Sequence, residues 1–353
     1  MNLAIDVASG EKSTEELVGG AIKSLFLNDD VNLILVGKEK SILRALSKLK
    51  YDRNRIDIKH TNQIIDMNES PASGIKHKKS ASVLIAARLV SNKEADGFFS
   101  PGNTGATLAA ALTEIGRLKG VMRPPLVSTL PKISGEFCMM DMGANVDCTP
   151  DYIAQFAVMG RVFAKRFLKI DNPRVGLLNI GEENSKGNVE TKKFFERLEK
   201  LKKINFVGNV EPNDMLKSDL VDVVIADGFN GNIVLKTMEG TASLMVNLLK
   251  TEIKKNPISI MGGLMMKPVF NSLRNQMSSD SVGSAILLGL NGGAFVGHGK
   301  TGGNGVKNAV LNMYNLWKNS ERTLWFWSKE KNFLINLIKG NLYGLYKILQ
   351  RLV

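Results

Sequence analysis

Residues 95–118 read ADGFFSPGNTGATLAAALTEIGRL, and this one stretch contains a strand, a turn and a helix. The short, largely apolar run Ala95–Ser100 predicts a buried strand. A turn rich in glycine and proline follows at Ser100–Gly105, and apolar residues then recur with helical spacing over Thr104–Leu118. A strand that leads through a short turn into a helix is the repeating unit of parallel α/β sheets.

The same alternation continues along most of the chain. Strands that are apolar throughout belong in a sheet covered on both faces, so we expect an α/β fold with a doubly wound, mostly parallel sheet. No internal repeat or low-complexity linker divides the sequence, and we expect one α/β domain at 1–315. The other predicted strands are Leu3–Asp6, Val31–Gly37, Ile56–His60, Leu126–Leu130, Phe137–Asp141, Val175–Gly181, Asn205–Gly208 and Val221–Asp227, and further helices are predicted at Leu17–Leu27, Ile42–Leu49, Val83–Val90 and Ile153–Leu168.

The pattern changes after Thr241. A helix at Ser243–Ile253 runs into a basic turn with a proline, and a second apolar helix ends near Met277, which predicts a protruding helical hairpin at about 241–280. Its apolar, basic-flanked tip fits either packing against a partner subunit or insertion into a membrane surface. The side chains expected at a membrane contact are Ile260, Met261, Leu264 and Met265.

Residues 316–353 form a basic C-terminal extension. Apolar residues from Leu334 to Leu352 recur with helical spacing, lysine and arginine lie on the other faces, and three tryptophans precede them. Such a helix suits the headgroup layer of a membrane. Docking on the body of the protein or on a partner is the alternative.

The formal net charge of +13 favours a polyanionic partner, either nucleic acid, anionic lipid or an acidic protein. Outside the extension the basic residues are not interleaved with aromatic ones, so we do not expect nucleic acid. Met1–Asp6 carries no secretory signal and no apolar run reaches the roughly 20 residues that span a bilayer, which indicates a cytoplasmic protein. Cys138 and Cys148 have neither metal-site nor redox-motif spacing, and we expect no metal.

Four of the predicted strands end in small, polar turns. In open parallel sheets, ligands bind outside the carboxyl ends of the strands. Free backbone amides at the start of a helix, with a glycine nearby, form a natural anion site. The four turns therefore predict one shared cleft, at one rim of the sheet, for an anionic ligand. They are Ser100–Gly105, Asp141–Asp147, Asn179–Asn188 and Asp227–Asn232.

Motifs in these turns and near them resemble the bacterial phosphate acyltransferases, in order from Met1 to about Val310. The resemblance implies a sheet like those of phosphotransacetylases and isopropylmalate dehydrogenases, and a homodimer. It also implies transfer of an acyl group from acyl carrier protein to inorganic phosphate without a cofactor. The acyl phosphate would supply glycerophospholipid synthesis through a membrane glycerol-3-phosphate acyltransferase, beside which the family sits loosely on the anionic membrane. The segments are GNTGA (102–106), DMGANVDCTP (141–150), QFAVMG (155–160), GLLNIGEE (176–183), KGN (186–188), NFVGNVE (205–211), DGFNGNIVLKTMEG (227–240) and LLGLNG (287–292).

The chain departs from the family in the turn after the first strand. The family usually has a Gly-Gly-Asp-His run there, whereas this chain has Val7–Lys12, VASGEK. A non-catalytic relative that binds acyl carrier protein or the membrane surface is therefore an alternative. An NTP-binding protein is a weaker one. It rests on Ala294–Thr301, which fits a relaxed phosphate-binding loop, but Gly302–Gly305 should delay the helix that such a loop needs.

Inorganic phosphate is already a competent nucleophile, and the sequence has no GxSxG motif and no evident Cys–His pair. The protein has to hold phosphate beside a thioester carbonyl, stabilise the oxyanion and let the thiolate leave. With the resemblance, the catalytic candidates are Lys186 as the cation and Asn232 and Asn145 as hydrogen-bond donors. The substrate-binding candidates are Gly102, Asn103 and Thr104 as an anion-binding loop, Asp147 and Glu182 as groups that orient the donors, and His298 as the group that protonates the thiolate.

Structural roles are the alternatives for several of these residues. Asn145 and Asp147 also fit a turn that caps the helix beginning near Thr149. A single lysine such as Lys186 is commonly a solvated surface charge.

Overall fold

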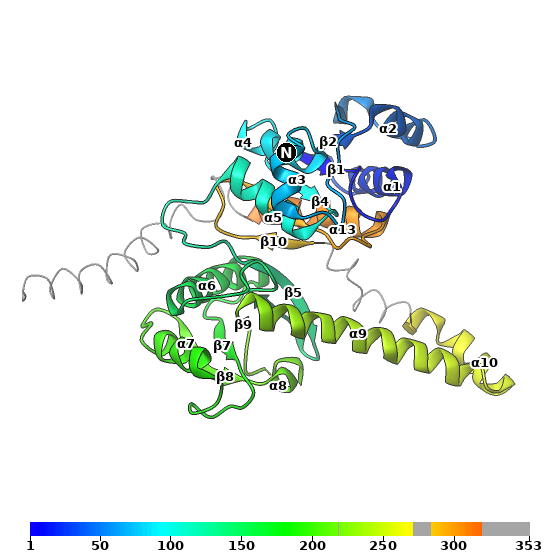
Figure 1. Cartoon of the computed structure of the whole chain (residues 1–353). Coiled ribbons are helices and arrows are strands. Elements are labelled where there is room, and N and C mark those ends of the chain that lie inside the picture. The colour runs from blue at the N-terminus through cyan, green and yellow to red at the C-terminus, as the bar shows by residue number, and fades with distance from the viewer. Residues whose placement is uncertain (218, 271–283, 320–353) are drawn as a thin grey trace, which may run out of the picture.

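The computed structural model describes residues 1–217, 219–270 and 284–319. Eleven strands form one sheet in the order β3-β2-β1-β4-β11-β10-β5-β6-β9-β7-β8, and helices lie on both of its faces (Figure 1). Neighbouring strands are parallel except at three pairings in the middle of the sheet. The expected α/β fold with a mostly parallel sheet is therefore confirmed. The strands are β1 (Asn2–Asp6), β2 (Asn32–Gly37), β3 (Ile56–His60), β4 (Gly97–Ser100), β5 (Leu126–Lys132), β6 (Gly135–Met140), β7 (Arg174–Leu178), β8 (Asn205–Val210), β9 (Val223–Ile225), β10 (Ala285–Leu287) and β11 (Gly293–Val296).

The sheet consists of two parallel blocks that run in opposite directions. Block one contains β3, β2, β1, β4 and β11, block two contains β6, β9, β7 and β8, and the central strands β10 and β5 join them through antiparallel pairings. Phe295 pairs with Ile286, Ile286 with Val127, and Val127 with Met140. The carboxyl ends of β11 and β6 therefore meet at the junction of the blocks. The prediction that all four turns lie at one rim is wrong, because the two blocks run in opposite directions and their strands therefore end toward opposite edges of the sheet.

Helices cover both faces of the sheet and follow most of the strands (Figure 1). The α-helices are α1 (Thr14–Leu25), α2 (Glu39–Leu46), α3 (Pro71–His77), α4 (Ser82–Ser91), α5 (Thr104–Ala110), α6 (Pro150–Phe163), α7 (Val189–Glu199), α8 (Pro212–Lys217), α9 (Gly228–Ile253), α10 (Pro257–Met265) and α13 (Gly303–Asn319). Short helical segments of other kinds are η1 (Arg53–Arg55), η2 (Ala111–Ile115) and η3 (Ala164–Leu168).

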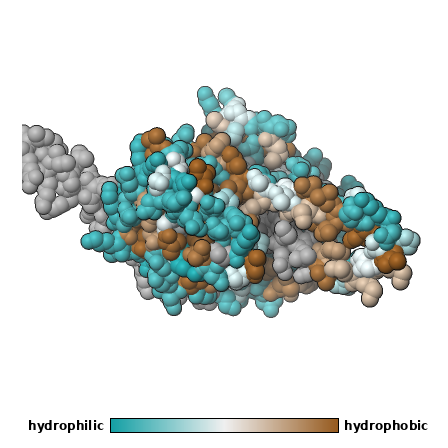
Figure 2. Space-filling model, turned by 90° about the horizontal axis from the view of Figure 1, so that it is seen from below, coloured by the Kyte–Doolittle hydropathy of each residue, from teal (hydrophilic) through white to brown (hydrophobic). Residues whose placement is uncertain are grey.

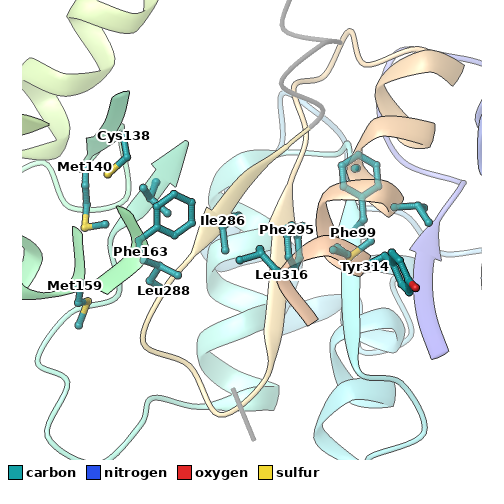
Figure 3. Close-up of a cluster of buried hydrophobic side chains, with 14 of the residues drawn as sticks. Phe99, Cys138, Met140, Met159, Phe163, Ile286, Leu288, Phe295, Tyr314 and Leu316 are labelled. Atoms are coloured by element: carbon teal, nitrogen blue, oxygen red, sulfur yellow. The ribbon is translucent and has the colours of Figure 1, made fainter. Parts of the chain in front are cut away.

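One of the two hydrophobic cores runs without interruption across the junction. Figure 3 shows a row of its side chains that runs from Met140 of β6, past Phe163, to Ile286 of β10 and Phe295 of β11, and then to Phe99 of β4. Alternate residues of a strand point to opposite faces of the sheet. The residues next to these in sequence, such as Val296, therefore belong to the second core on the other face. Shared packing of this kind ties the two blocks into one body.

The strands β10 and β11 were not among the predicted elements. Each is at most four residues long, and glycines flank them, so neither reaches the length at which an apolar run is distinctive. These two strands lie in the middle of the sheet, between β4 and β5. Their two antiparallel pairings leave β5 parallel to block one, so the antiparallel pairing of β5 with β6 is the one that reverses block two.

The hairpin begins earlier than its pattern predicts. Its first arm, α9, starts at Gly228 instead of Ser243, because Asp227 caps the helix by accepting a hydrogen bond from the backbone NH of Asn230 at 2.8 Å. The second arm begins with α10, and the predicted end near Met277 lies outside the described residues. The α9–α10 arm projects from the body (Figure 1), and Figure 2 shows hydrophobic residues over much of its surface.

The last described helix, α13, crosses the predicted boundary between 315 and 316, and Leu316 is buried against the body. The rest of the predicted extension, 320–353, lies outside the described residues. The helix begins at Gly303, so the expectation that Gly302–Gly305 delays it is wrong. Within the described ranges, no helix combines the length and the apolar character needed to cross a membrane.

Candidate active site

A pocket of about 430 Å³ opens where the two blocks meet. Its floor is the face of the sheet that presents alternate residues of β5, namely Leu126, Ser128 and Leu130. Leu108 of α5 and Leu235 of α9 form walls. The interior of the pocket is therefore mainly apolar, and polar side chains stand at its rim.

The rim receives side chains from both blocks. Thr104 follows β4 and His298 follows β11, both in block one, whereas Asn232 lies in α9 directly after β9 of block two. Three candidates from distant parts of the sequence thus line one pocket. Glu11, from the turn after β1, joins them, and its backbone NH donates to the carbonyl oxygen of Gly299 at 2.9 Å.

Asp141 organises the turn of block two that reaches the pocket. Its buried carboxylate accepts hydrogen bonds from the backbone NH of Leu126 (2.9 Å), Ala144 (3.0 Å) and Asn145 (2.7 Å). The Asn145 side-chain amide donates to the same carboxylate at 2.8 Å and to the carbonyl oxygen of Pro124 at 2.9 Å. Both hydrogens of that amide are thus engaged within the protein, and Asn145 does not line the pocket. These contacts assign Asn145 a positioning role in the turn.

Asp6 plays the corresponding part in block one. It is fully buried and accepts hydrogen bonds from the backbone NH of Ser9 at 3.1 Å and from the Ser100 hydroxyl at 2.8 Å. Ser100 in turn accepts from the backbone NH of Gly102 at 3.2 Å. A Cβ on Gly102 would lie 2.8 Å from the Cβ of Ser9, so glycine is required for the close approach of the two turns.

Asn103 caps α5 and ties it to a neighbouring loop. Its side-chain oxygen accepts from the backbone NH of Ala106 at 3.1 Å, and its amide donates to the carbonyl oxygens of Met67 (3.1 Å) and Glu69 (3.0 Å). Of the predicted loop Gly102–Thr104, only Thr104 lines the pocket. Gly102 and Asn103 shape the loop behind it.

The His298 imidazole is held in a defined orientation at the rim. Its Nδ1 accepts a hydrogen bond from the backbone NH of Lys300 at 3.2 Å. Burial, followed by the positive charge of Lys236, lowers the pKa of His298 below its ordinary value. The ring is therefore neutral at pH 7 with its proton on Nε2, which makes it a hydrogen-bond donor at that atom.

Besides Glu11, two charged residues of the pocket were not among the predicted ones. Lys236 and Glu239 line it together, and Lys236 Nζ lies 2.7 Å from Glu239 Oε2. The spacing in the sequence could have indicated both residues. Asn232, Lys236 and Glu239 are four and three residues apart, so they share one face of α9.

Lys186, Glu182 and Asp147 do not line the pocket. Lys186 is exposed, and its Nζ lies 3.7 Å from a carboxylate oxygen of Glu183. The cause is topological: β9 stands between β6 and β7 in the sheet, so the turn after β7 starts farther from the junction than the turns after β6 and β9. The structure thus unites three of the four predicted turns.

Neither cysteine is prepared for nucleophilic attack. Burial raises the pKa of Cys138, and burial followed by the charge of Asp141 raises the pKa of Cys148 to about 12. Both thiols are protonated at neutral pH. Among the described residues there is no group of histidine, cysteine, aspartate or glutamate side chains that could hold a metal ion.

Comparison with known proteins identifies the reaction class. A family model described as "Fatty acid synthesis protein" matches residues 1–320. A phosphate acyltransferase of Brachyspira hyodysenteriae is 82% identical over 314 residues, which cover 89% of this chain and 93% of that protein. The chain belongs to the phosphate acyltransferase family. It is therefore an acyltransferase of fatty acid and phospholipid synthesis, which decides against the non-catalytic and NTP-binding alternatives.

A more distant phosphate acyltransferase agrees with this assignment, and solved structures share the fold. The phosphate acyltransferase of Leptospira biflexa is 43% identical over 88% of this chain and 91% of its own length. A phosphotransacetylase from Streptococcus pyogenes shares the fold with a TM-score of 0.58 and 16% identity, over 90% of this chain and 94% of that one. A branched-chain phosphotransacylase from Enterococcus faecalis gives 0.52 and 11%, over 89% and 99%. The expected likeness to the phosphotransacetylase fold is confirmed.

Proposed function

We propose that the acyl donor is an acyl carrier protein thioester and that the acceptor is inorganic phosphate. A phosphate oxygen attacks the thioester carbonyl carbon, a C–O bond forms, and the C–S bond breaks. The proton of hydrogen phosphate ends on the released thiol, so the products are acyl phosphate and free acyl carrier protein. The observation that carries this proposal is the pocket at the junction, whose polar rim surrounds a mainly apolar interior suited to an acyl group.

The rim residues divide between the two reactants. Asn232 and the neutral His298 donate hydrogen bonds to reacting oxygens, and Thr104 binds phosphate. Lys236 supplies positive charge inside the pocket, with Glu239 holding it in position. Lys186 acts as a second cation when the turn after β7 approaches a phosphate at the rim, and Glu182 orients that turn. Asp147 does the same for the turn after β6.

The charge of the chain supports a protein-bound donor. An excess of 13 positive charges attracts an acidic carrier protein over a long range and speeds its encounter with the pocket. A donor attached to a small carrier such as coenzyme A gains less from this field.

The test compares the two donors directly. The purified protein is incubated with inorganic phosphate and either palmitoyl-acyl carrier protein or palmitoyl-coenzyme A, and acyl phosphate is trapped as the hydroxamate. We expect a higher kcat/KM with the carrier protein, and a difference that shrinks as salt rises. An equal or higher kcat/KM with the coenzyme A thioester contradicts the proposed donor.

The projecting arm supports two further parts of the proposal. Ile260, Met261, Leu264 and Met265 of α10 are between 43% and 83% exposed, which suits contact with an anionic membrane near the glycerol-3-phosphate acyltransferase that consumes the product. On α9, four exposed apolar side chains form a stripe that suits a second copy of the chain in a homodimer. They are Leu244, Met245, Leu248 and Leu249.

A further inference from the structure

Two buried side-chain atoms in the described part of the chain have no hydrogen-bond partner, Arg161 Nε and Ser284 Oγ. Of the two residues, Ser284 lines the pocket, and it is only 7% exposed. A buried hydroxyl without a partner lowers the stability of the folded state, and such groups are rare in native proteins. Its position on the pocket wall points to a partner that arrives with the substrate.

Pairing within the sheet defines where this hydroxyl lies. Ser284 directly precedes β10, whose first residue, Ala285, pairs with Val296 of β11. Continuing this antiparallel register by one residue sets Ser284 opposite Gly297, next to His298. Ser284 and His298 both line the pocket, Ser284 just before β10 and His298 just after β11.

The surroundings of Ser284 favour a neutral acceptor over a phosphate. The neighbouring wall is built from Ala285 and Val296, and Lys236 is engaged by Glu239 at 2.7 Å. A phosphate dianion needs cations or several donors, whereas a carbonyl oxygen requires only one or two donors in an apolar setting. One hydroxyl and one neutral imidazole in the lining of the same pocket match the carbonyl oxygen of an acyl group.

We propose that Ser284 is a catalytic residue that donates a hydrogen bond to the carbonyl oxygen of the acyl group. The thioester itself is taken from the proposed function. As phosphate attacks, the carbonyl π pair moves onto the oxygen, and it returns when the C–S bond breaks. Ser284 keeps its own proton throughout, and its hydrogen bond is strongest while the oxygen carries the negative charge.

The test is the Ser284→Ala variant of the full-length protein. We expect kcat to fall about tenfold or more, because an oxyanion donor is lost. The KM for phosphate should stay within about twofold of the wild-type value, because phosphate is not bound by this hydroxyl. The melting temperature should be equal to that of the wild type or higher, since the variant removes a buried hydroxyl that has no partner.

Ser24→Ala is the matched control. Ser24 is also fully buried, but its hydroxyl donates to the carbonyl oxygen of Ala21 at 2.6 Å within α1. This variant should show the opposite behaviour, a lower melting temperature with kcat unchanged.

Both thioester donors are used in these assays, so a preference for coenzyme A rejects the proposed donor while Ser284 is still tested on the same carbonyl. A kcat of Ser284→Ala within about twofold of wild type overturns the inference. So does a raised KM for phosphate at constant kcat, since the hydroxyl would then serve the acceptor.

Discussion

At the scale of single residues, the site depends on which side chains still have hydrogen bonds to offer. The amides of Asn103 and Asn145 are engaged by carbonyl and carboxylate oxygens of the protein, whereas Asn232 is exposed at the rim. A Cβ on Gly143 would lie 3.5 Å from Cγ of Asn232, so the turn after β6 approaches this amide closely. Among the three asparagines, Asn232 is the one suited to contact substrate.

We predict that Asn232→Ala lowers kcat about a hundredfold, because a donor to the reacting oxygens is removed. Asn145→Ala should act mainly through stability, lowering the free energy of unfolding by about 2 kcal/mol, because Asp141 and Pro124 lose a donor. Steady-state kinetics and urea unfolding of the two variants separate these effects. A stable Asn232→Ala enzyme with wild-type kcat removes Asn232 from the mechanism.

His298 gives a prediction about pH. Its folded-state pKa lies below 6.5, so the ring is neutral above that value and gains a proton only as pH falls further. Protonation removes the lone pair with which Nδ1 accepts the backbone NH of Lys300, so the ring loses the contact that orients it. We therefore predict that kcat falls on the acid side, below pH 6.5. In His298→Asn, whose amide donates without titrating, this fall should disappear.

If His298 instead donates a proton to the thiolate, as predicted from the sequence, the pH dependence of activity is the opposite. Activity would then decline as pH rises through the pKa, and His298→Asn would lose that decline. The pH profile of kcat for the two proteins therefore distinguishes the two roles. The unfolded chain takes up the proton first, since its pKa is the higher one, so His298 should also make the folded protein less stable as pH falls below 6.5.

At the scale of elements, α1 and α13 cross at two glycines. A Cβ on Gly20 would lie 2.0 Å from the carbonyl oxygen of Gly303, a distance that backbone atoms do not tolerate. The adjacent Gly19 has nothing within 4 Å of its Cβ position. The same helix therefore contains a glycine that its packing requires and one that it does not.

Gly20→Ala should lower the free energy of unfolding by about 2 kcal/mol or more, because the two helices have to separate. Gly19→Ala should raise it by about 0.5–1 kcal/mol, since alanine is the better helix former. Urea denaturation of the pair checks both signs. Equal effects of the two substitutions contradict the close crossing.

Elements were predictable from the sequence where their signal is long or strongly apolar. The run Ile56–His60 matches β3 at both ends, and Thr104 is the first residue of α5. The strands β10 and β11 were missed because three or four residues between glycines carry little pattern. The start of α9 was missed because its first turn, GFNG, has the composition of a loop. The helix begins there because Asp227 caps it.

At the scale of the whole molecule, the site exists because two opposed blocks end at a common junction. The motifs were enough to name Thr104 and Asn232, and the need for a group that protonates the thiolate added His298; all three line one pocket. The motifs were not enough to separate these from Lys186, because the order of β9 and β7 in the sheet does not follow from the order of the motifs in the chain.

The projecting arm leads to a prediction at this scale. The double variant Met261→Ser, Leu264→Ser should reduce sedimentation with phosphatidylglycerol vesicles about tenfold, because two exposed apolar side chains of α10 are lost. Ile133→Ser is the control, since Ile133 is 83% exposed but lies on the body. Unchanged vesicle binding of the double variant rejects the membrane contact, and a shift from dimer to monomer assigns α10 to the interface between copies.

The helix α9 has its first turns at the pocket and its last turn beside α10. The 14 residues of α9 that follow Glu239, its last pocket residue, make a rod about 21 Å long. If α10 rests on a bilayer, this rod holds the pocket, where the product is released, at a fixed distance from the lipid surface. An acyl phosphate with a long hydrocarbon tail then has to travel that distance through water or be handed directly to the next enzyme.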